Sequence, residues 1–433
     1  MNALERVDRI TRNTLAIALA LGCTSVRAEE SATYLTGGWG GIRSSLIDRG
    51  LDLSLGYVSE VANNPRGGER DGTRNTDQWT LAASLDLEKL LGWNDAHFKI
   101  AFTERNGRDL DNDARLGTLQ QVQEVWGRGQ TGRLTQLWYE QSHGAVDWKL
   151  GRMTVGEDFL AFSCDFQNLT FCGSQPGNVR GDYWFNWPVS QWAARIKVTP
   201  NDQTEVLVGT YQVNPRYADD RWASHHGFYP DFPSGTTGAL IPVQFGWLPT
   251  MHGLKGSYRV GVWYDTSNAP DVYLDVNREP IVETGAPPLE RNHRDGAYLT
   301  FEQQATGRTD GRGAHLFLNA TWADRDTSSS IARQIAAGLQ FIGPFASRPN
   351  DAVGVALGSS RVNDRVAKGQ RLQNTLGSDV PVQHSEYVLE LFYGWQPVHY
   401  LTLRPNLQFV KDPGGTSAHE DVVVIGLKSL VTF

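Results

Sequence analysis

Ten side chains that can carry charge, donate or accept hydrogen bonds, or stack against a ring fall at alternate positions of short segments with strand character. They are Arg105, Glu140, Lys149, Arg195, Lys197, Arg259, Trp263, Asp265, Glu302 and Arg404. Alternate positions of a strand share one face. Both charge signs and an aromatic ring on one face suit weak, repeated contacts with a hydroxyl-rich solute. Any polar face contains such residues, so we expect fewer than half of them to touch a solute.

A second set of candidates lies in two long segments without period-2 alternation. The segment 154–189 is rich in aromatic residues and also contains Glu157, Asp158 and Trp184, and the segment 106–132 contains Glu124 and Arg128. Cys164 and Cys172 lie close together in the first segment, and an oxidising compartment favours a disulfide between them over two buried thiols. A stiffened loop folded inward would form a defined constriction; the alternative is an outer cap over the mouth.

Other chemistry has little support in the sequence. No spacing supports a catalytic constellation, and the adjacent His225 and His226 fit surface residues of a loop better than metal ligands. The sequence therefore predicts no enzyme, no metal site and no cofactor.

The residues that would position these groups form segments of about ten residues with alternating polarity. We predict sixteen strands, at 51–61, 77–88, 95–105, 133–141, 145–153, 190–199, 203–213, 240–249, 255–266, 296–305, 312–323, 331–341, 351–361, 383–395, 398–410 and 420–433. The strand at 240–249 is the weakest because Pro242 and Pro249 interrupt it, and Pro405 interrupts another. A slip of one residue in any strand would exchange its two faces.

The connections between these segments distinguish two fold classes. Long connections, such as 106–132 and 154–189, mostly alternate with short ones, such as 142–144 and 200–202. An up-and-down barrel with long outer loops and tight periplasmic turns requires that alternation and an even number of strands. A soluble sandwich does not. We therefore predict an all-β fold, a transmembrane antiparallel barrel of sixteen strands.

Both ends of the chain indicate export. Residues 1–28 are typical of a signal peptide, with three arginines before a short apolar run and a small-residue cleavage pattern at Val26-Arg27-Ala28. A lipoprotein site at Cys23 is the alternative, but Ala20 and Leu21 fit it poorly. The chain carries a net charge of -8, and removing a segment of net +2 leaves about -10, which argues against nucleic acid as a partner.

The last strand ends in an aromatic residue. Val423, Ile425, Leu427, Val431 and Phe433 share one face, which resembles the terminal signal by which outer-membrane barrels are recognised for insertion. We therefore expect the barrel-assembly machinery to bind Phe433.

Several short motifs, in order along the chain, resemble the carbohydrate-selective porin family of OprB-like proteins. The matching segments are 37–43 (GGWGGIR), 50–53 (GLDL), 137–141 (LWYEQ), 150–152 (LGR), 158–159 (DF), 185–188 (FNWP), 396–397 (QP), 403–408 (LRPNLQ) and 413–415 (PGG). The resemblance covers nearly the whole mature chain.

The resemblance implies more than the residues alone. It implies a sixteen-stranded barrel with a short helix near the N-terminus, a channel narrowed by inward-folded loops, and a preference for monosaccharides such as glucose. We accordingly divide the chain into a signal peptide at 1–28, a periplasmic segment with a short helix at 29–50, and a barrel at 51–433 whose constriction loop is 154–189.

Three functions remain to be distinguished. The leading hypothesis is passive sugar diffusion across the bacterial outer membrane, with small sugars and outer-membrane lipid as partners and a homotrimer left open. The second is a general or anion-preferring porin, suggested by the Arg and Lys residues of the polar face. The third is a secreted all-β protein that binds or degrades carbohydrate.

Overall fold

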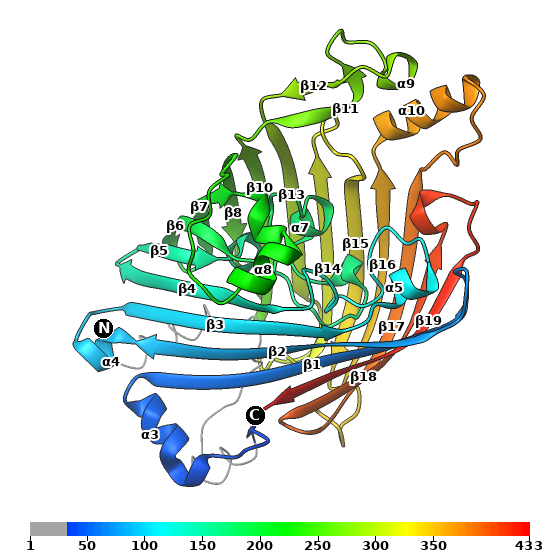
Figure 1. Ribbon diagram of the computed structural model, residues 1–433. Coiled ribbons are helices and arrows are strands. Elements are labelled where there is room, and N and C mark those ends of the chain that lie inside the picture. The colour runs from blue at the N-terminus through cyan, green and yellow to red at the C-terminus, as the bar shows by residue number, and fades with distance from the viewer. Residues whose placement is uncertain (1–32) are drawn as a thin grey trace.

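Sixteen antiparallel strands close into a barrel in the computed structural model, which describes residues 33–433. The strands are β1 (Leu51–Arg66), β2 (Thr73–Asp86), β3 (Ala96–Gly107), β4 (Gly132–His143), β5 (Val146–Met153), β6 (Gln191–Asn201), β7 (Thr204–Val213), β8 (Gly238–Trp247), β10 (Leu254–Asp265), β13 (Arg294–Gln304), β14 (Gly313–Ala323), β15 (Ile331–Ile342), β16 (Ala352–Val362), β17 (Ser385–Val398), β18 (Leu401–Lys411) and β19 (Val422–Thr432). Each strand pairs with its sequence neighbour, and β1 pairs with β19 to close the barrel (Figure 1). The sixteen-stranded prediction is confirmed.

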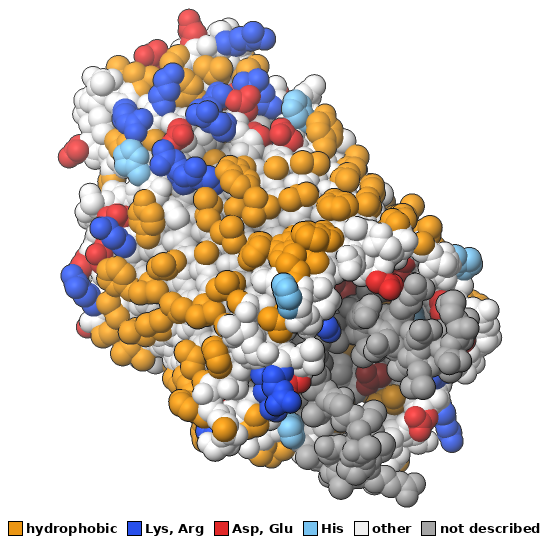
Figure 2. All heavy atoms as spheres, turned by 180° about the vertical axis from the view of Figure 1, so that it is seen from behind, with side chains coloured by type: hydrophobic (Ala, Val, Ile, Leu, Met, Phe, Trp, Pro, Cys, Tyr) orange, Lys and Arg blue, Asp and Glu red, His pale blue; other side chains and the backbone are white. Residues whose placement is uncertain are grey.

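The two faces of each strand have opposite surroundings, as the alternation predicted. On β6, Arg195 is 3% exposed whereas its neighbour Ile196 is 52% exposed. On β10, Val260 and Val262 are exposed and Asp265 is buried. Apolar side chains cover much of the outer wall in the space-filling view (Figure 2). An apolar outer face and a polar inner face are what a barrel in a bilayer requires.

The two prolines that weakened the strand prediction lie within barrel strands. Pro242 of β8 pairs with Trp263 of β10, but on the other side of β8 the pairing with β7 is interrupted between Val243 and Leu240. Pro405 of β18 pairs with Leu427, and its pairing with β17 is interrupted in the same way. Because proline lacks an N–H, each strand loses ladder bonds on one side only.

Helices and a small hairpin occupy the connections. The helices are α3 (Ile42–Asp48), α4 (Leu87–Leu91), α5 (Leu110–Ala114), α6 (Val155–Asp158), α7 (Gln175–Val179), α8 (Asp220–His226), α9 (Ile281–Thr284) and α10 (Asp364–Thr375), with 3-10 turns η1 (Trp39–Gly41), η2 (Leu169–Phe171), η3 (Pro215–Ala218) and η4 (Pro413–Gly415). The strands β11 (Ala269–Asp275) and β12 (Pro288–Arg291) form the hairpin, and β9 (Thr250–Met251) extends the turn before β10. None of the helices within residues 33–433 has the length and hydrophobicity of a membrane span.

The short helix near the N-terminus is α3, and it lies at the end of the barrel that has the short turns. Arg43 of α3 is buried, stacks on Tyr34 and Trp39, and donates to the backbone oxygen of Phe433 at 2.9 Å. The N–H of Leu35 donates to Thr432 at 2.9 Å. These contacts hold the segment against the closing strand β19. The signal peptide predicted at 1–28 lies outside the described residues.

The opposite end of the barrel has the long loops, which by the rule for outer-membrane barrels makes it the extracellular end. The hairpin β11–β12 and the helix α10 stand beyond the strand ends there (Figure 1). Arg365 of α10 joins Asp271 of β11 at 2.5 Å. The loops 106–132 and 154–189, by contrast, contact the inner wall of the barrel.

Candidate functional site

The loop 154–189 begins with the one-turn helix α6, which is bound to the inner wall by buried charges. Asp158 of α6 accepts from Nζ of Lys149 at 2.9 Å and from Nη2 of Arg195 at 3.3 Å. Arg195 also pairs with Glu140 and Asp147 of the neighbouring strands. Burial acts to raise the pKa of Asp158, but the positive charges of Lys149 and Arg195 outweigh it and lower that pKa to about 2. This wall therefore holds the start of the loop by ionised pairs over the physiological pH range.

The middle of the loop reaches the wall formed by β17, β18, β19 and β1. The backbone N–H groups of Gln167 and Asn168 donate to the two carboxylate oxygens of Glu390 at 2.8 Å each. Arg404 pairs with Asp165 of the loop at 2.7 Å. One stretch of four loop residues is thus fixed to β17 and β18 by a charged group at each end.

The second long loop joins the first at this wall. Nζ of Lys428 lies 2.7 Å from Glu124 of the loop 106–132 and 3.1 Å from Glu60 of β1. The same Nζ donates to the backbone oxygen of Phe166 at 3.1 Å. A single buried lysine therefore connects both loops to the seam between β19 and β1.

A third set of contacts holds the end of the loop 154–189 against β10 and β13. Arg294 pairs with Asp182 of the loop at 2.6 Å and with Asp265 of β10 at 2.5 Å. Trp263 donates to the hydroxyl of Tyr183 at 3.0 Å and packs edge-on against Trp184 with 5.4 Å between the ring centroids. Trp184 is fully buried and Trp263 is 2% exposed, so both rings contribute to packing.

The tip of the loop carries the predicted cross-link. Cys164 and Cys172 form a disulfide, which confirms that prediction. The bridged segment contains Asp165, Gln167 and Asn168, the residues that reach β17 and β18. The disulfide therefore shapes the part of the loop that lies farthest from its own strands.

Replacing both cysteines by serine is expected to lower the free energy of unfolding by about 2–4 kcal/mol, since the cross-link restricts the unfolded chain. The measurement is the urea midpoint of the detergent-solubilised barrel. Reducing the wild-type protein should give the same shift and should not change the double variant further. Equal midpoints for C164S/C172S and the wild type would contradict this expectation.

The loop 106–132 contains a buried carboxyl group with a shifted pKa. Asp111 of α5 accepts from the hydroxyl of Thr118 and from the N–H of Val122 at 2.9 Å. Burial, together with the neighbouring Asp109, raises the pKa of Asp111 to about 7. Asp113 behaves oppositely, because hydrogen bonds from Arg74 and Arg108 lower its pKa.

We expect this loop to loosen as the pH rises from about 4 to 7, because in that window the folded loop binds a proton at Asp111 that the unfolded chain releases. Hydrogen exchange of residues 106–124, corrected for intrinsic rates, measures it at pH 5 and pH 8. Asp111→Asn should reduce the difference between the two pH values, and the part that remains comes from the neighbouring Asp109, whose pKa burial also raises. Asp113→Asn should leave it, since Asp113 is ionised in both states above pH 4. A difference of the same size in D111N and the wild type would refute the assignment.

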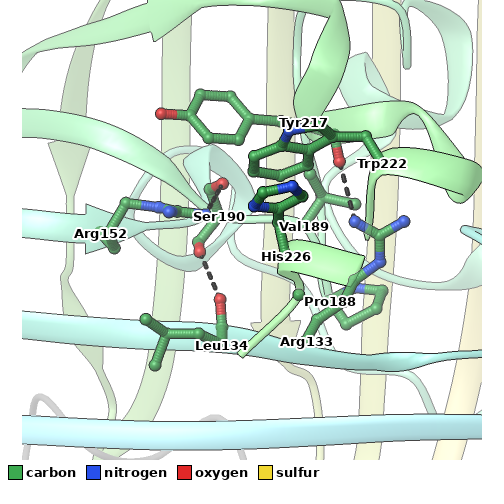
Figure 3. Close-up of a pocket in the computed structure, with 10 residues that line it drawn as sticks. Arg133, Leu134, Arg152, Pro188, Val189, Ser190, Tyr217, Trp222 and His226 are labelled. Atoms are coloured by element: carbon green, nitrogen blue, oxygen red, sulfur yellow. Dashed lines mark hydrogen bonds between the residues drawn. The ribbon is translucent and has the colours of Figure 1, made fainter. Parts of the chain in front are cut away.

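Three arginines of β3, β4 and β5, together with Arg128 of the loop 106–132, have no carboxylate partner of comparable burial among the described residues. Arg105 donates to the backbone oxygen of Trp126 at 3.1 Å, and Arg128 donates to Gly181 at 2.6 Å. Arg133 donates to Tyr217 at 2.8 Å, and Arg152 to Ser190 at 2.9 Å. Arg133 and Arg152 lie beside a small pocket (Figure 3). Its volume of about 10 Å³ has room for one water molecule.

The two histidines lie in this region but on the surface. His226 stacks on Trp222 with 4.9 Å between ring centroids (Figure 3), and its Nδ1 lies 2.8 Å from Asp231. Both His225 and His226 are exposed on α8.

The structure joins some of the predicted site residues and separates others. Lys149, Arg195, Glu140 and Asp158 form one cluster, and Glu157 of the same helix accepts from Gln136. Arg259 lies apart, paired with Glu205 at 2.8 Å, and its side chain is 21% exposed. Glu302 and Lys197 also lie on the inner face. The predicted inner-facing set is therefore distributed around the wall and does not form one centre.

Sequence reasoning missed several residues that hold the loops. Glu390 and Lys428 lie on the inner faces of predicted strands. The alternation of polar and apolar positions that identified Arg404 could therefore have identified them too. Asp165 and Asp182 lie in a loop without periodicity, where the sequence offered no such signal. Their importance emerges only from contacts with distant strands.

Comparisons with known proteins agree with this architecture. Residues 70–433 match the family described as carbohydrate-selective porin, OprB family. Porin B of Pseudomonas aeruginosa is 43% identical over 439 residues, which cover 96% of this chain and 95% of that protein. The putative porin QuiX of Acinetobacter baylyi is 34% identical over 423 residues, covering 92% and 93%.

A solved structure gives the same result. The high-pH structure of Pseudomonas putida OprB superposes with a TM-score of 0.89 at 43% identity, over 93% of this chain and 99% of that one. The chain belongs to the OprB family of carbohydrate-selective porins, which are channels of the bacterial outer membrane.

Proposed function

We propose that the barrel passes monosaccharides such as glucose into the periplasm by passive diffusion, through a constriction made by the loops 154–189 and 106–132. The observation that carries the proposal is the attachment of the loop 154–189 to three separate parts of the inner wall, at Asp158, at Gln167 and Asn168, and at Asp182. A loop held across the lumen narrows it and fixes its width. A small neutral solute then passes where a larger one is retarded.

We further propose that the charged residues form two groups, one that holds the loop and one that contacts the solute. The side chains of Arg195 and Lys149 are 2% and 5% exposed and both form ion pairs with Asp158, so they hold the loop. The side chains of Arg259, Arg404 and Asp165 are between 15% and 24% exposed, which leaves them able to contact a solute. Glu302, Glu124 and Arg128 are partly exposed as well. These are our candidates for hydrogen bonding to sugar hydroxyls.

Liposome swelling with glucose, a disaccharide and an amino acid tests the function. We expect the fastest swelling with glucose. Equal rates for all three solutes would show that the pore is not selective. Extraction only by detergent and heat-modifiable gel mobility would separately exclude a secreted all-β protein.

Replacing Arg259 by glutamine is expected to weaken glucose retention in the channel by about threefold to tenfold, because a charge-assisted hydrogen bond is replaced by a neutral one. Current noise in planar bilayers at increasing glucose concentration measures the half-saturating concentration. Arg308→Gln, in the turn between β13 and β14, is the matched control and should leave it unchanged. An unaltered R259Q channel would remove Arg259 from the site.

A general or anion-preferring porin is the second candidate. The observation that favours it is the group Arg105, Arg128, Arg133 and Arg152, whose hydrogen bonds go mainly to backbone oxygens. Strong anion selectivity in planar bilayers, unaffected by glucose, would support this function over the first.

A further inference from the structure

Three arginines gather on the outside of the barrel where β14, β15 and β16 reach the extracellular end. Arg325 follows β14, and Arg333 of β15 is the Cα partner of Arg361 of β16. On β16, Leu357 is 62% exposed whereas Ser360 is 1% exposed. Arg361 lies an even number of residues from Leu357 and therefore faces outward, and its partner Arg333 on β15 lies on the same face. Figure 2 shows Lys and Arg side chains gathered at one end of the wall, beyond the apolar band.

The cluster has an excess of positive charge. Asp364 of α10 accepts from Nη2 of Arg361 at 2.7 Å, and Nη2 of Arg325 lies 3.9 Å from its other oxygen. The hydrogen bond from Arg361 and the charges of Arg361, Arg325 and Arg333 lower the pKa of Asp364. One carboxylate therefore faces three guanidinium groups.

The other nearby carboxylates are already engaged. Asp326 pairs with Arg291 at 3.1 Å and with Arg365. Asp324 accepts from the N–H groups of Asp326 and Thr327 at 3.0 and 2.8 Å. Its charge acts on Arg291, and among the described residues it forms no ion pair with the three outer arginines. Among residues 33–433 the three outer arginines thus share one carboxylate, Asp364, which leaves the cluster an excess of about two positive charges.

Such an arrangement is unfavourable unless an anion joins it. Like charges at directly opposed positions of neighbouring strands repel each other, and Arg333 and Arg361 occupy such positions. Guanidinium groups bind phosphate by paired hydrogen bonds. A phosphate monoester carries roughly -1.5 to -2 charges at neutral pH, which matches the excess.

The height of the cluster on the barrel indicates the source of the phosphate. Trp322, 40% exposed on the outer face of β14, is the Cα partner of Arg333. Tyr387 on β17 is 49% exposed at the same end. Aromatic rings on the outer face of a barrel mark the level of the lipid headgroups. The arginines therefore lie beside the headgroups of the outer leaflet.

We propose that Arg325, Arg333 and Arg361 form a binding site on the outer wall for the phosphate of an outer-leaflet glycolipid headgroup. The site lies outside the lumen, so it is independent of the transported solute. It would fix the rotational position of a lipid against β14–β16 and relieve the repulsion between the paired arginines.

The experiment compares the wild type with R325Q/R333Q, which keeps Arg361 in place to bind Asp364. The control is R308Q/R312Q, at the opposite end of β13 and β14. Native mass spectrometry of the detergent-solubilised protein measures binding of diphosphoryl lipid A, its dephosphorylated form and inorganic phosphate. We expect R325Q/R333Q to bind diphosphoryl lipid A about tenfold more weakly than the wild type, and R308Q/R312Q to bind it as the wild type does.

Three results would overturn the proposal. Diphosphoryl lipid A could bind R325Q/R333Q as tightly as the wild type, the dephosphorylated form could bind the wild type equally well, or inorganic phosphate could displace the lipid at equal concentration. The last result would indicate a site for free phosphate. Heat-modifiable mobility and unchanged glucose swelling in R325Q/R333Q would show that the variant folds and that its effect is confined to the outer wall.

Discussion

Replacing Arg195 by methionine should destabilise the barrel by about 3–5 kcal/mol, because the change leaves buried carboxylates without their counter-charge. The Arg195 side chain is 2% exposed and binds Glu140, Asp147 and Asp158. Lys149 still binds Asp158, and the charge of Lys197 acts on Asp147 and Asp158, so two positive charges remain beside three carboxylates. The variant therefore keeps an excess of negative charge in a buried cluster.

Urea unfolding in detergent micelles measures the effect, with the slope of the transition as a check that the exposed area is unchanged. Arg66→Met is the matched control. Arg66 also forms an ion pair, with Glu420 at 2.9 Å, but both side chains are more than half exposed, so its loss should change stability by less than about 1 kcal/mol.

Neutralising the partners should recover part of the loss. The triple variant R195M/D147N/D158N removes the uncompensated charges and should unfold at a higher urea concentration than R195M. If R195M unfolds at the same urea concentration as R66M, the ion pairs of Arg195 do not stabilise the barrel.

The barrel could be predicted from the sequence because the membrane imposes the signal. A strand with lipid on one side and polar contacts on the other must alternate with period 2, and the strand predicted at 190–199 is found at Gln191–Asn201. Even the strand with Pro242 is present, since a proline removes ladder bonds on one side only. The even number of strands and the alternation of loop lengths follow from closing such a barrel.

Outside the membrane that constraint disappears, and the sequence does not predict the secondary structure of the extracellular loops. The sequence predicts only a connection between the strands at 255–266 and 296–305, but this connection contains the β11–β12 hairpin and α9. The helix α10 lies in another connection and was missed too. These elements pack against one another above the barrel, where no two-sided environment imposes a regular pattern.

The sequence could predict which strand face carries each candidate residue, but not which residues of the loops contact it. Parity placed Lys149, Arg195 and Arg404 on the inner face, where the structure has them. It could not show that Glu390 receives the backbone of Gln167, because 223 residues separate the two. The sequence predicts that Trp263 faces inward and stacks against a solute. The ring does face inward, but Tyr183 and Trp184 of the folded loop cover it. Contacts made by a loop depend on its path, which has no period.

Replacing residues 161–182 by a short Gly/Ser linker should raise the single-channel conductance severalfold and remove the preference for glucose over a disaccharide. The change deletes the disulfide-bonded tip and the contacts to Glu390, Arg404, Lys428 and Arg294. It keeps α6, which holds the start of the loop to Lys149 and Arg195. The lumen would then be limited mainly by its wall.

The matched control removes a loop of similar size that does not enter the barrel. Replacing residues 272–287 by the same linker deletes most of the β11–β12 hairpin, which contacts α10 and stands beyond the strand ends (Figure 1). This variant should keep the conductance and the solute preference of the wild type. Planar bilayer recordings and liposome swelling measure both quantities for each protein.

A second variant tests whether the loop 154–189 forms the constriction, in case the protein with the shortened loop does not fold. Glu390→Leu removes the acceptor of two loop N–H groups and leaves the loop itself intact. Because the tip then loses one of its anchors, the conductance should rise in the same direction by a smaller amount, with more frequent current fluctuations. If both variants conduct as the wild type does and still prefer glucose, the constriction lies elsewhere, and the remaining candidates are the arginines from β3 to β5.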